Sequence, residues 1–163
     1  MAKLMNIASA HHGKYTKSLV GCGAINGIAG EDVRIINKTR RQVDVQGIDN
    51  HLIVDIPIVT VGAVIPTQCG EANGIFHQYA YTRKAKSIHL SLHLEAFKNN
   101  ANDKFIKVNG GMQHILTADN YVIPLNVKTG LAYLTMQLYT DREWDTLPHV
   151  IMTADIDWDL SIL

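Results

Sequence analysis

Cysteine is scarce in this 163-residue sequence, which contains only Cys22 and Cys69. Two cysteines so far apart form neither a disulfide framework nor a Cys-x-x-Cys motif. Long hydrophobic runs are also absent, because none approaches the roughly 18 apolar residues that a transmembrane helix needs. We therefore expect a reduced, intracellular, cytoplasmic protein that makes no membrane contact.

Charge of one sign is not in excess either. Lys and Arg together number 15, as do Asp and Glu, so the formal net charge is zero. Such a chain has no general electrostatic attraction to nucleic acid, and its short basic clusters at residues 38–41 and 83–86 are typical of solvated turns. Hydrophobic residues make up 47% of the chain, which is enough for a folded core.

Short apolar or alternating runs separated by turn residues fill most of the chain and predict a mainly β fold. Residues 52–65 are apolar on both faces, as a buried strand is, and Pro57 predicts a break or a sheet edge within them. Together with residues 75–81 they predict a hairpin. In residues 131–139 the alternation predicts Leu134, Met136 and Leu138 on one face and Tyr133, Thr135 and Tyr139 on the other. Further strands are predicted at residues 17–24, 31–37, 41–48, 104–111, 114–127 (as a hairpin) and 149–154.

Two segments favour helices. Residues 88–98 carry an apolar stripe and are followed by Asn99-Asn100, a stop signal. Thr140 and Glu143 have the spacing of a capping box, which predicts a short helix. Within the first segment, His89 and His93 would share one helix face. A zinc site needs further ligands, so surface or helix-packing histidines are the expected interpretation, and we expect no metal and no cofactor.

A glycine-rich segment follows the first predicted strand. Four of the ten residues from 21 to 30 are glycine, and no acid, histidine or serine lies among them. The pattern of two aliphatic residues followed by Gly21-Cys22-Gly23-Ala24 resembles the first active-site turn of retropepsin-like aspartic proteases. More specifically, it resembles the protease region of Ty1/copia-type retrotransposon polyproteins, which have Asp-Ser/Thr-Gly-Ala at this place.

The resemblance extends over about residues 18–163. The stretches "RRQVDVQGIDNH", "DIPIVTVGAVIPTQCG", "NYVIPLNVKTGLAY" and "HVIMTADIDWD" resemble consecutive blocks of such polyproteins. It implies a small closed β-barrel whose active-site turn is covered by a hairpin, here residues 52–81, with one or two short helices. Residues 1–17 are expected to form a disordered or loosely held tail, and the resemblance implies a retropepsin-like domain at residues 18–100. Residues 101–163 would add C-terminal strands or a small appended unit.

The resemblance also implies a chemistry that this sequence has lost. Aspartic proteases use two facing carboxylates that share a proton, and each subunit of a retropepsin homodimer supplies one. Gly21 stands where the family has that Asp, so both carboxylates of a dimer would be missing. Cys22 replaces the hydroxyl residue and Ile25 the second acid of the motif. The implied protein is a degenerate protease-like domain whose ancestral activity was polyprotein hydrolysis, with a homodimer partner and a peptide or polyprotein segment as ligand.

Other interpretations remain open. Another aspartate (Asp32, Asp44, Asp49 or Asp55) could replace the missing carboxylate, or Cys22 could act as a thiol nucleophile with a histidine base. Asp32 is expected on the strand that follows the glycine turn. Alternatively, the chain is a non-enzymatic β-rich interaction module. The acids and tryptophans of "WDTLPH" and "DIDWD" would then be candidates for its surface. The pattern does not indicate substrate-binding residues.

Overall fold

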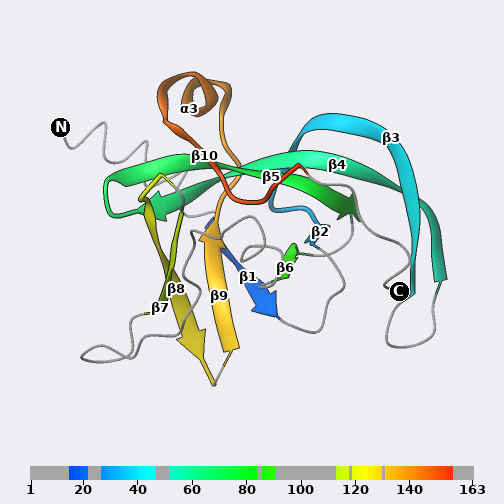
Figure 1. The fold of residues 1–163 in the computed structure, drawn as a ribbon, viewed down its shortest axis with the longest axis horizontal. Coiled ribbons are helices and arrows are strands. Elements are labelled where there is room, and N and C mark those ends of the chain that lie inside the picture. The colour runs from blue at the N-terminus through cyan, green and yellow to red at the C-terminus, as the bar shows by residue number, and fades with distance from the viewer. Residues whose placement is uncertain are drawn as a thin grey trace.

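A computed structural model describes residues 15–21, 27–46, 52–83, 86–90, 113–117, 119–129 and 131–155. Strands form nearly all of the regular structure in these ranges, which confirms the mainly β prediction (Figure 1). Within the same ranges no helix is long and apolar enough to cross a membrane. In chain order the elements are β1 (Thr16–Gly21), β2 (Ile28–Ala29), β3 (Arg34–Gln46), β4 (Leu52–Thr67), β5 (Gly70–Tyr81), β6 (Ile88–Leu90), β7 (Gln113–Leu116), β8 (Val122–Lys128), β9 (Leu131–Met136), α3 (Asp141–Thr146) and β10 (His149–Ile151).

The strands form one sheet in the order β3-β4-β5-β2-β6-β1-β9-β8-β7, and β10 pairs with β5. β1 lies in the interior of this order, parallel to β6 and antiparallel to β9. The predicted hairpin at residues 52–81 is confirmed as β4 and β5, which are antiparallel and joined by Gln68 and Cys69. The predicted hairpin at residues 114–127 is confirmed as β7 and β8, and the late strand as β10.

The sheet curls but does not close, so the expected closed barrel is not what the described strands form. Gln137, directly after β9, exchanges two backbone hydrogen bonds with Val64 of β4, at 2.8 and 3.0 Å. This contact is a single bridge. β3 already pairs with β4 as far as Gly62, so only the end of β4 is available to the segment after β9. β3 and β7 remain the two ends of the described sheet.

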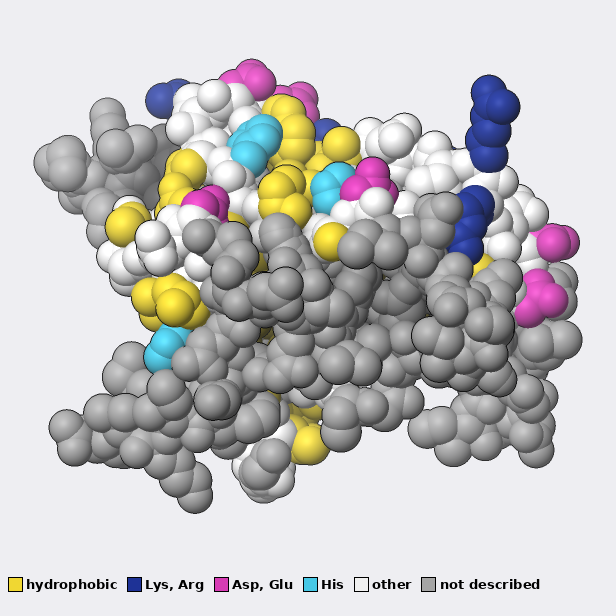
Figure 2. All heavy atoms as spheres, in the orientation of Figure 1, with side chains coloured by type: hydrophobic (Ala, Val, Ile, Leu, Met, Phe, Trp, Pro, Cys, Tyr) yellow, Lys and Arg dark blue, Asp and Glu magenta, His cyan; other side chains and the backbone are white. Residues whose placement is uncertain are grey.

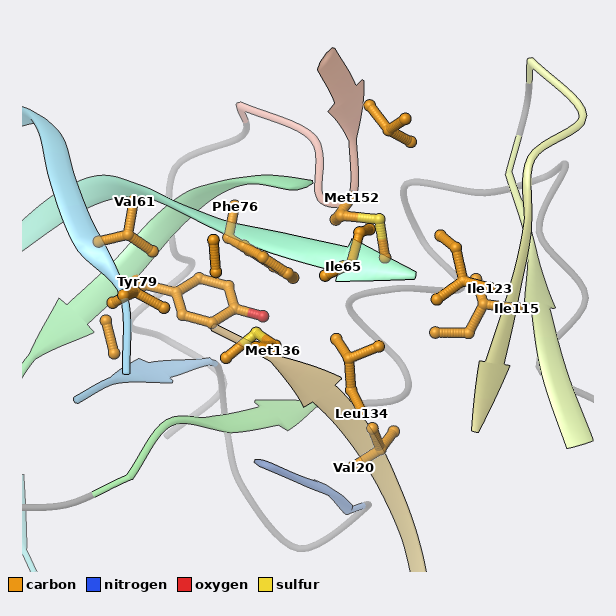
Figure 3. Packing of buried hydrophobic residues seen from close by; sticks show 14 of the residues in the cluster. Val20, Val61, Ile65, Phe76, Tyr79, Ile115, Ile123, Leu134, Met136 and Met152 are labelled. Atoms are coloured by element: carbon orange, nitrogen blue, oxygen red, sulfur yellow. The ribbon is translucent and has the colours of Figure 1, made fainter. Parts of the chain in front are cut away.

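The hydrophobic core lies inside the curled sheet, and its residues come from strands throughout the described chain. Figure 3 shows Val61, Phe76 and Tyr79 of β4 and β5 facing Leu134 and Met136 of β9. Full burial of each aliphatic or aromatic side chain contributes on the order of 2 kcal/mol. The same cluster continues with Val20, Ile65, Ile115, Ile123, Val150 and Met152. Strands after residue 101 therefore share one sheet and one core with the strands before residue 100.

Three element predictions need correction. Residues 88–90 form strand β6 instead of the start of a helix, because Ile88 pairs with both Leu19 of β1 and Ile28 of β2. The two strands expected at residues 31–37 and 41–48 are one strand, β3, with an irregular register inside it. β4 continues through Pro57, which pairs with Gln42 of β3, and the register of that ladder shifts between Pro57 and Val59. The rest of the predicted helix and the strand predicted at residues 104–111 lie outside the described residues.

The alternation of β9 holds only to the end of that strand. Ala132, Leu134 and Met136 are buried, as predicted for Leu134 and Met136. Beyond Gln137 the prediction is wrong, because Leu138 is 38% exposed whereas Tyr139 is 7% exposed. The chain leaves the strand at the bridge to Val64 and turns toward α3.

The predicted capping box is confirmed at the start of α3. Thr140 Oγ1 accepts a hydrogen bond from the Glu143 backbone N–H at 3.1 Å, and Glu143 Oε1 accepts one from the Thr140 N–H at 2.9 Å. Two of the backbone donors at the N-terminal end are thereby satisfied. α3 contains no buried residue, and buried Asn73 of β5 adds a tertiary contact by donating a hydrogen bond to the Glu143 carbonyl at 2.9 Å.

Candidate functional site

Gly21 is the last residue of β1, where the parallel strand β6 places Leu90 beside it. A Cβ atom at Gly21 would lie 3.8 Å from Leu19 Cδ2, which is ordinary van der Waals contact. The backbone there is not in the left-handed region that favours glycine. Position 21 can therefore carry a Cβ atom without backbone strain or overlap with the described residues. The other members of the predicted turn (Cys22, Gly23 and Ala24) lie outside the described residues.

Gly27, at the far end of the same segment, is glycine for a packing reason. A Cβ atom there would fall 2.3 Å from Tyr79 Cζ in the aromatic ring, a distance that carbon atoms do not adopt. The Gly27 carbonyl also accepts a hydrogen bond from the Ala80 N–H at 3.2 Å. The segment therefore returns to the sheet in close contact with β5.

A buried carboxylate joins the strands around this segment. Asp32 lies in the turn before β3 and is 4% exposed. Its Oδ2 accepts a hydrogen bond from Ser18 Oγ at 3.0 Å, and its Oδ1 accepts two from Ser87, from Oγ at 2.6 Å and from the backbone N–H at 3.0 Å. Ser87 Oγ in turn accepts from the Gly30 N–H at 2.9 Å. Both carboxylate oxygens thus hold β1, the β2–β3 turn and the start of β6 together.

Asp32 differs from its prediction in its place in the chain. It was expected on the strand after the glycine turn, whereas it lies in the turn that precedes β3. Its carboxylate is engaged by Ser18 and Ser87, groups that fix the position of β1 and β6. This geometry favours a structural role for the carboxylate, because its oxygens already accept three hydrogen bonds.

His89 is a second buried polar residue near the same strands. It lies on β6, is fully buried, and its Nδ1 is 2.8 Å from the hydroxyl of Tyr79. Its Nε2 has no hydrogen-bond partner among the described residues. Burial lowers the pKa of His89 to about 4 from its ordinary value of 6.5, and the negative charge of Asp32 opposes part of that shift. Burial likewise raises the pKa of Tyr79.

The prediction for His89 therefore needs correction: it is a neutral core residue on a strand, packed 5.0 Å from the Phe76 ring centre. His93, its predicted neighbour on a helix face, lies outside the described residues. Nowhere in the described part of the chain do three His, Cys, Asp or Glu side chains gather into a metal-binding group.

The remaining candidate residues are dispersed. Asp44 and Asp55 are exposed and lie on β3 and β4, where the Asp55 backbone N–H donates to Asp44 Oδ1 at 3.1 Å. Asp49, like Cys22, lies outside the described residues. Cys69 is exposed in the β4–β5 turn, and among the described candidates Asp44, Asp55 and Cys69 all lie on strands or turns that are not neighbours of β1 in the sheet.

The "WDTLPH" segment forms an aromatic stack at the surface. Trp144 of α3 lies between Tyr139 and His149, with ring centres 5.0 and 4.1 Å apart. The Arg34 guanidinium covers Tyr139 at 4.4 Å and pairs with Asp141 at 3.0 Å. Figure 2 shows hydrophobic and histidine side chains gathered over α3 and β10, with acidic side chains beside them.

Comparison of this chain with family models, with curated proteins and with solved structures finds no match.

Proposed function

We propose that this chain is a degenerate aspartic-protease-like domain of a copia-type retrotransposon polyprotein. In this proposal the active-site turn is retained, but its catalytic carboxylate is missing. The observation that carries the proposal is at Gly21. This residue ends a short strand in the interior of the sheet, at the place where the resembling family has its catalytic Asp, and a Cβ atom there meets only ordinary contacts.

The course of the chain supports the same proposal. The glycine-rich segment leaves β1 and returns through β2, and the long β4–β5 hairpin follows it, in the order that the resemblance implies. The path β4-β5-β2-β6-β1-β9 also returns to β4 through the Val64–Gln137 bridge. We infer from this that the curled sheet is related to a retropepsin-like barrel, with β3, β7 and β8 as additional strands.

The chemistry explains why the loss of one residue would end catalysis. One ionised carboxylate takes a proton from the attacking water, while its protonated partner polarises the scissile carbonyl. Gly21 can do neither, and a homodimer would repeat the deficiency in both subunits. Among the described residues, Asp32 is the buried carboxylate nearest to Gly21 in the sequence. Its oxygens already accept hydrogen bonds from Ser18 and Ser87.

The test restores the missing groups. We expect the Gly21→Asp/Cys22→Ser variant to cleave a peptide library at mildly acidic pH in a pepstatin-sensitive reaction. The matched Gly21→Asn/Cys22→Ser variant has the same side-chain shape but no carboxylate, so it should stay inactive. The expected difference in rate is on the order of 10²-fold or more, as for loss of a general acid or base.

Two outcomes would contradict the proposal. One is a folded, dimeric Gly21→Asp/Cys22→Ser variant that cleaves nothing. The other is peptidase activity in the unmodified chain. If Cys22→Ala abolished that activity, the thiol alternative would replace the proposal.

A further inference from the structure

A row of paired residues crosses the sheet on the side where α3 lies. Val64 of β4 pairs with Asn73 of β5 on one side and with Gln137, directly after β9, on the other. Residues that pair directly across neighbouring strands point to the same face of a sheet. Ala63 and Ile65 belong to the hydrophobic core, so by alternation this row faces away from the core. Figure 1 shows α3 and β9 on opposite sides of the β4–β5 ribbon, which agrees with this assignment.

The row is buried although it lies outside the core. Asn73 Nδ2 donates a hydrogen bond to the Glu143 carbonyl of α3 at 2.9 Å. From the other side, the hydroxyl of Tyr15, directly before β1, donates to the carboxylate of Glu71, two positions before Asn73 on β5. α3 and Tyr15 thus cover the row, and Gln137 is only 1% exposed and Asn73 0% exposed.

Three polar atoms in this buried row have no partner. Neither Nε2 nor Oε1 of Gln137 has a hydrogen-bond partner among the described residues, and the same holds for Oδ1 of Asn73. The two residues lie two strand spacings apart, roughly 10 Å between Cα atoms, with Val64 between them. Buried polar groups in native proteins are almost always hydrogen-bonded, to other protein groups or to ordered water. The three atoms therefore indicate a ligand that the two amides share.

The chemistry of the two amides limits what that ligand can be. Gln137 Nε2 can only donate a hydrogen bond, whereas Gln137 Oε1 and Asn73 Oδ1 can only accept one. A metal cation cannot accept from the nitrogen, and a fully ionised anion cannot donate to the oxygens. The ligand is thus a neutral molecule that both donates and accepts, and it is small because the row is closely covered. Water fits this description, since a buried water molecule typically makes about three hydrogen bonds to such groups.

We propose that Gln137 and Asn73 form a binding site for ordered internal water, which connects the segment after β9 to β5. Because Asn73 also holds α3, the water extends this connection to the helix. The site lies at the Val64–Gln137 bridge, where the curled sheet returns to β4. Bound water would therefore strengthen a contact that has only one backbone bridge. The proposal is independent of the protease-like origin, since it uses no residue of the glycine-rich turn.

Direct detection of the water tests the proposal on the unmodified full-length chain. In a high-resolution crystal structure we expect an ordered water within about 3.2 Å of both the Gln137 amide and Asn73 Oδ1. In solution, the side-chain amide protons of Gln137 should show a nuclear Overhauser effect to a long-lived water molecule. The exposed amide of Asn126 is the matched control and should show none. A crystal structure in which protein groups satisfy the Gln137 amide, or no long-lived water at Gln137 in solution, would overturn the proposal.

A double-mutant cycle tests whether the two amides share the water. Gln137→Met and Asn73→Leu each replace an amide by an apolar side chain of similar size. Either change alone leaves the other amide poorly satisfied, whereas both together leave no amide that needs the water. We therefore expect the double variant to have a folding equilibrium constant about fivefold or more above that expected from the single variants, as measured by urea unfolding.

The control cycle combines Gln137→Met with His89→Phe. The Nε2 atom of His89 also lacks a partner among the described residues, but this histidine packs against Phe76 on the core side of the sheet. The two changes should be additive to within about twofold. Additive effects in the Gln137–Asn73 cycle as well would overturn the shared site. If a variant does not fold, the crystal structure and the water signals of the unmodified chain decide the question.

Discussion

Gly21 and Gly27 belong to one glycine-rich segment, but the structure needs only one of them to be glycine. The ring of Tyr79 fills the space where a Gly27 side chain would lie, whereas only Leu19 approaches a side chain at Gly21, at ordinary contact distance. The sequence marks both alike as turn glycines. The difference depends on a ring that lies 52 positions later in the chain than Gly27, so composition and spacing could not predict it.

This contrast gives a prediction for stability. Gly27→Ala should lower the free energy of unfolding by about 1–3 kcal/mol, because an added methyl group overlaps the Tyr79 ring. The matched Gly21→Ala change should stay within about 0.5 kcal/mol, since position 21 has room. Urea unfolding of the two variants measures both values. Equal losses would show that the segment needs glycine at both places, and the room inferred at position 21 would be wrong.

His89 shows a second limit at the residue scale. Its spacing from His93 suggested one face of a helix, whereas the structure buries it on β6 against Phe76 and Tyr79. The strand forms because Ile88 pairs with residues far away in the sequence. A local pattern contains no information about such partners, so the helical interpretation could not be excluded from the sequence.

Burial of His89 predicts how stability depends on pH. The folded pKa of about 4 lies below the ordinary value of 6.5, so the unfolded chain binds the proton more readily between these values. The free energy of unfolding should therefore be highest above about pH 6.5 and fall as the pH decreases toward 4, by about 3 kcal/mol in total from this group. Urea unfolding at a series of pH values measures the slope.

His89→Phe should flatten that slope whatever it does to the absolute stability, because phenylalanine does not titrate. His149→Gln, at an exposed histidine, is the matched control and should leave the slope unchanged. A slope between pH 6.5 and 4 that survives His89→Phe would mean that other groups cause the acid sensitivity.

At the element scale, the sequence predicts those features that are encoded locally. The β4–β5 and β7–β8 hairpins each join runs that are close in sequence, and the capping box of α3 lies within four residues. The basic stretch at residues 38–41 is an instructive intermediate case. It was interpreted as a turn between two strands. The structure has a register shift there, in which residues 39–41 lie opposite Ile58 inside one long strand.

At the scale of the whole molecule, the sheet order interleaves the two parts of the chain that the sequence suggested. β9 lies beside β1, and β10 lies beside β5. The carboxylate of Asp32 similarly joins Ser18 to Ser87, which are distant in sequence. Such contacts follow from the three-dimensional path and have no signal in composition or periodicity. A boundary at residue 100 therefore does not separate two cores among the described residues.

This arrangement predicts which fragments fold. A fragment of residues 1–100 lacks β9 and β10, so it would expose the core-facing side chains of β1, β4 and β5, and we expect no cooperative urea transition from it. A fragment of residues 1–155 keeps every described strand and should unfold cooperatively. Circular dichroism during a urea titration distinguishes the two. Cooperative unfolding of the 1–100 fragment would show that the earlier strands form an independent unit on which the later ones merely pack. In that case the shared core would be an addition to a protease-sized domain and not a requirement for its folding.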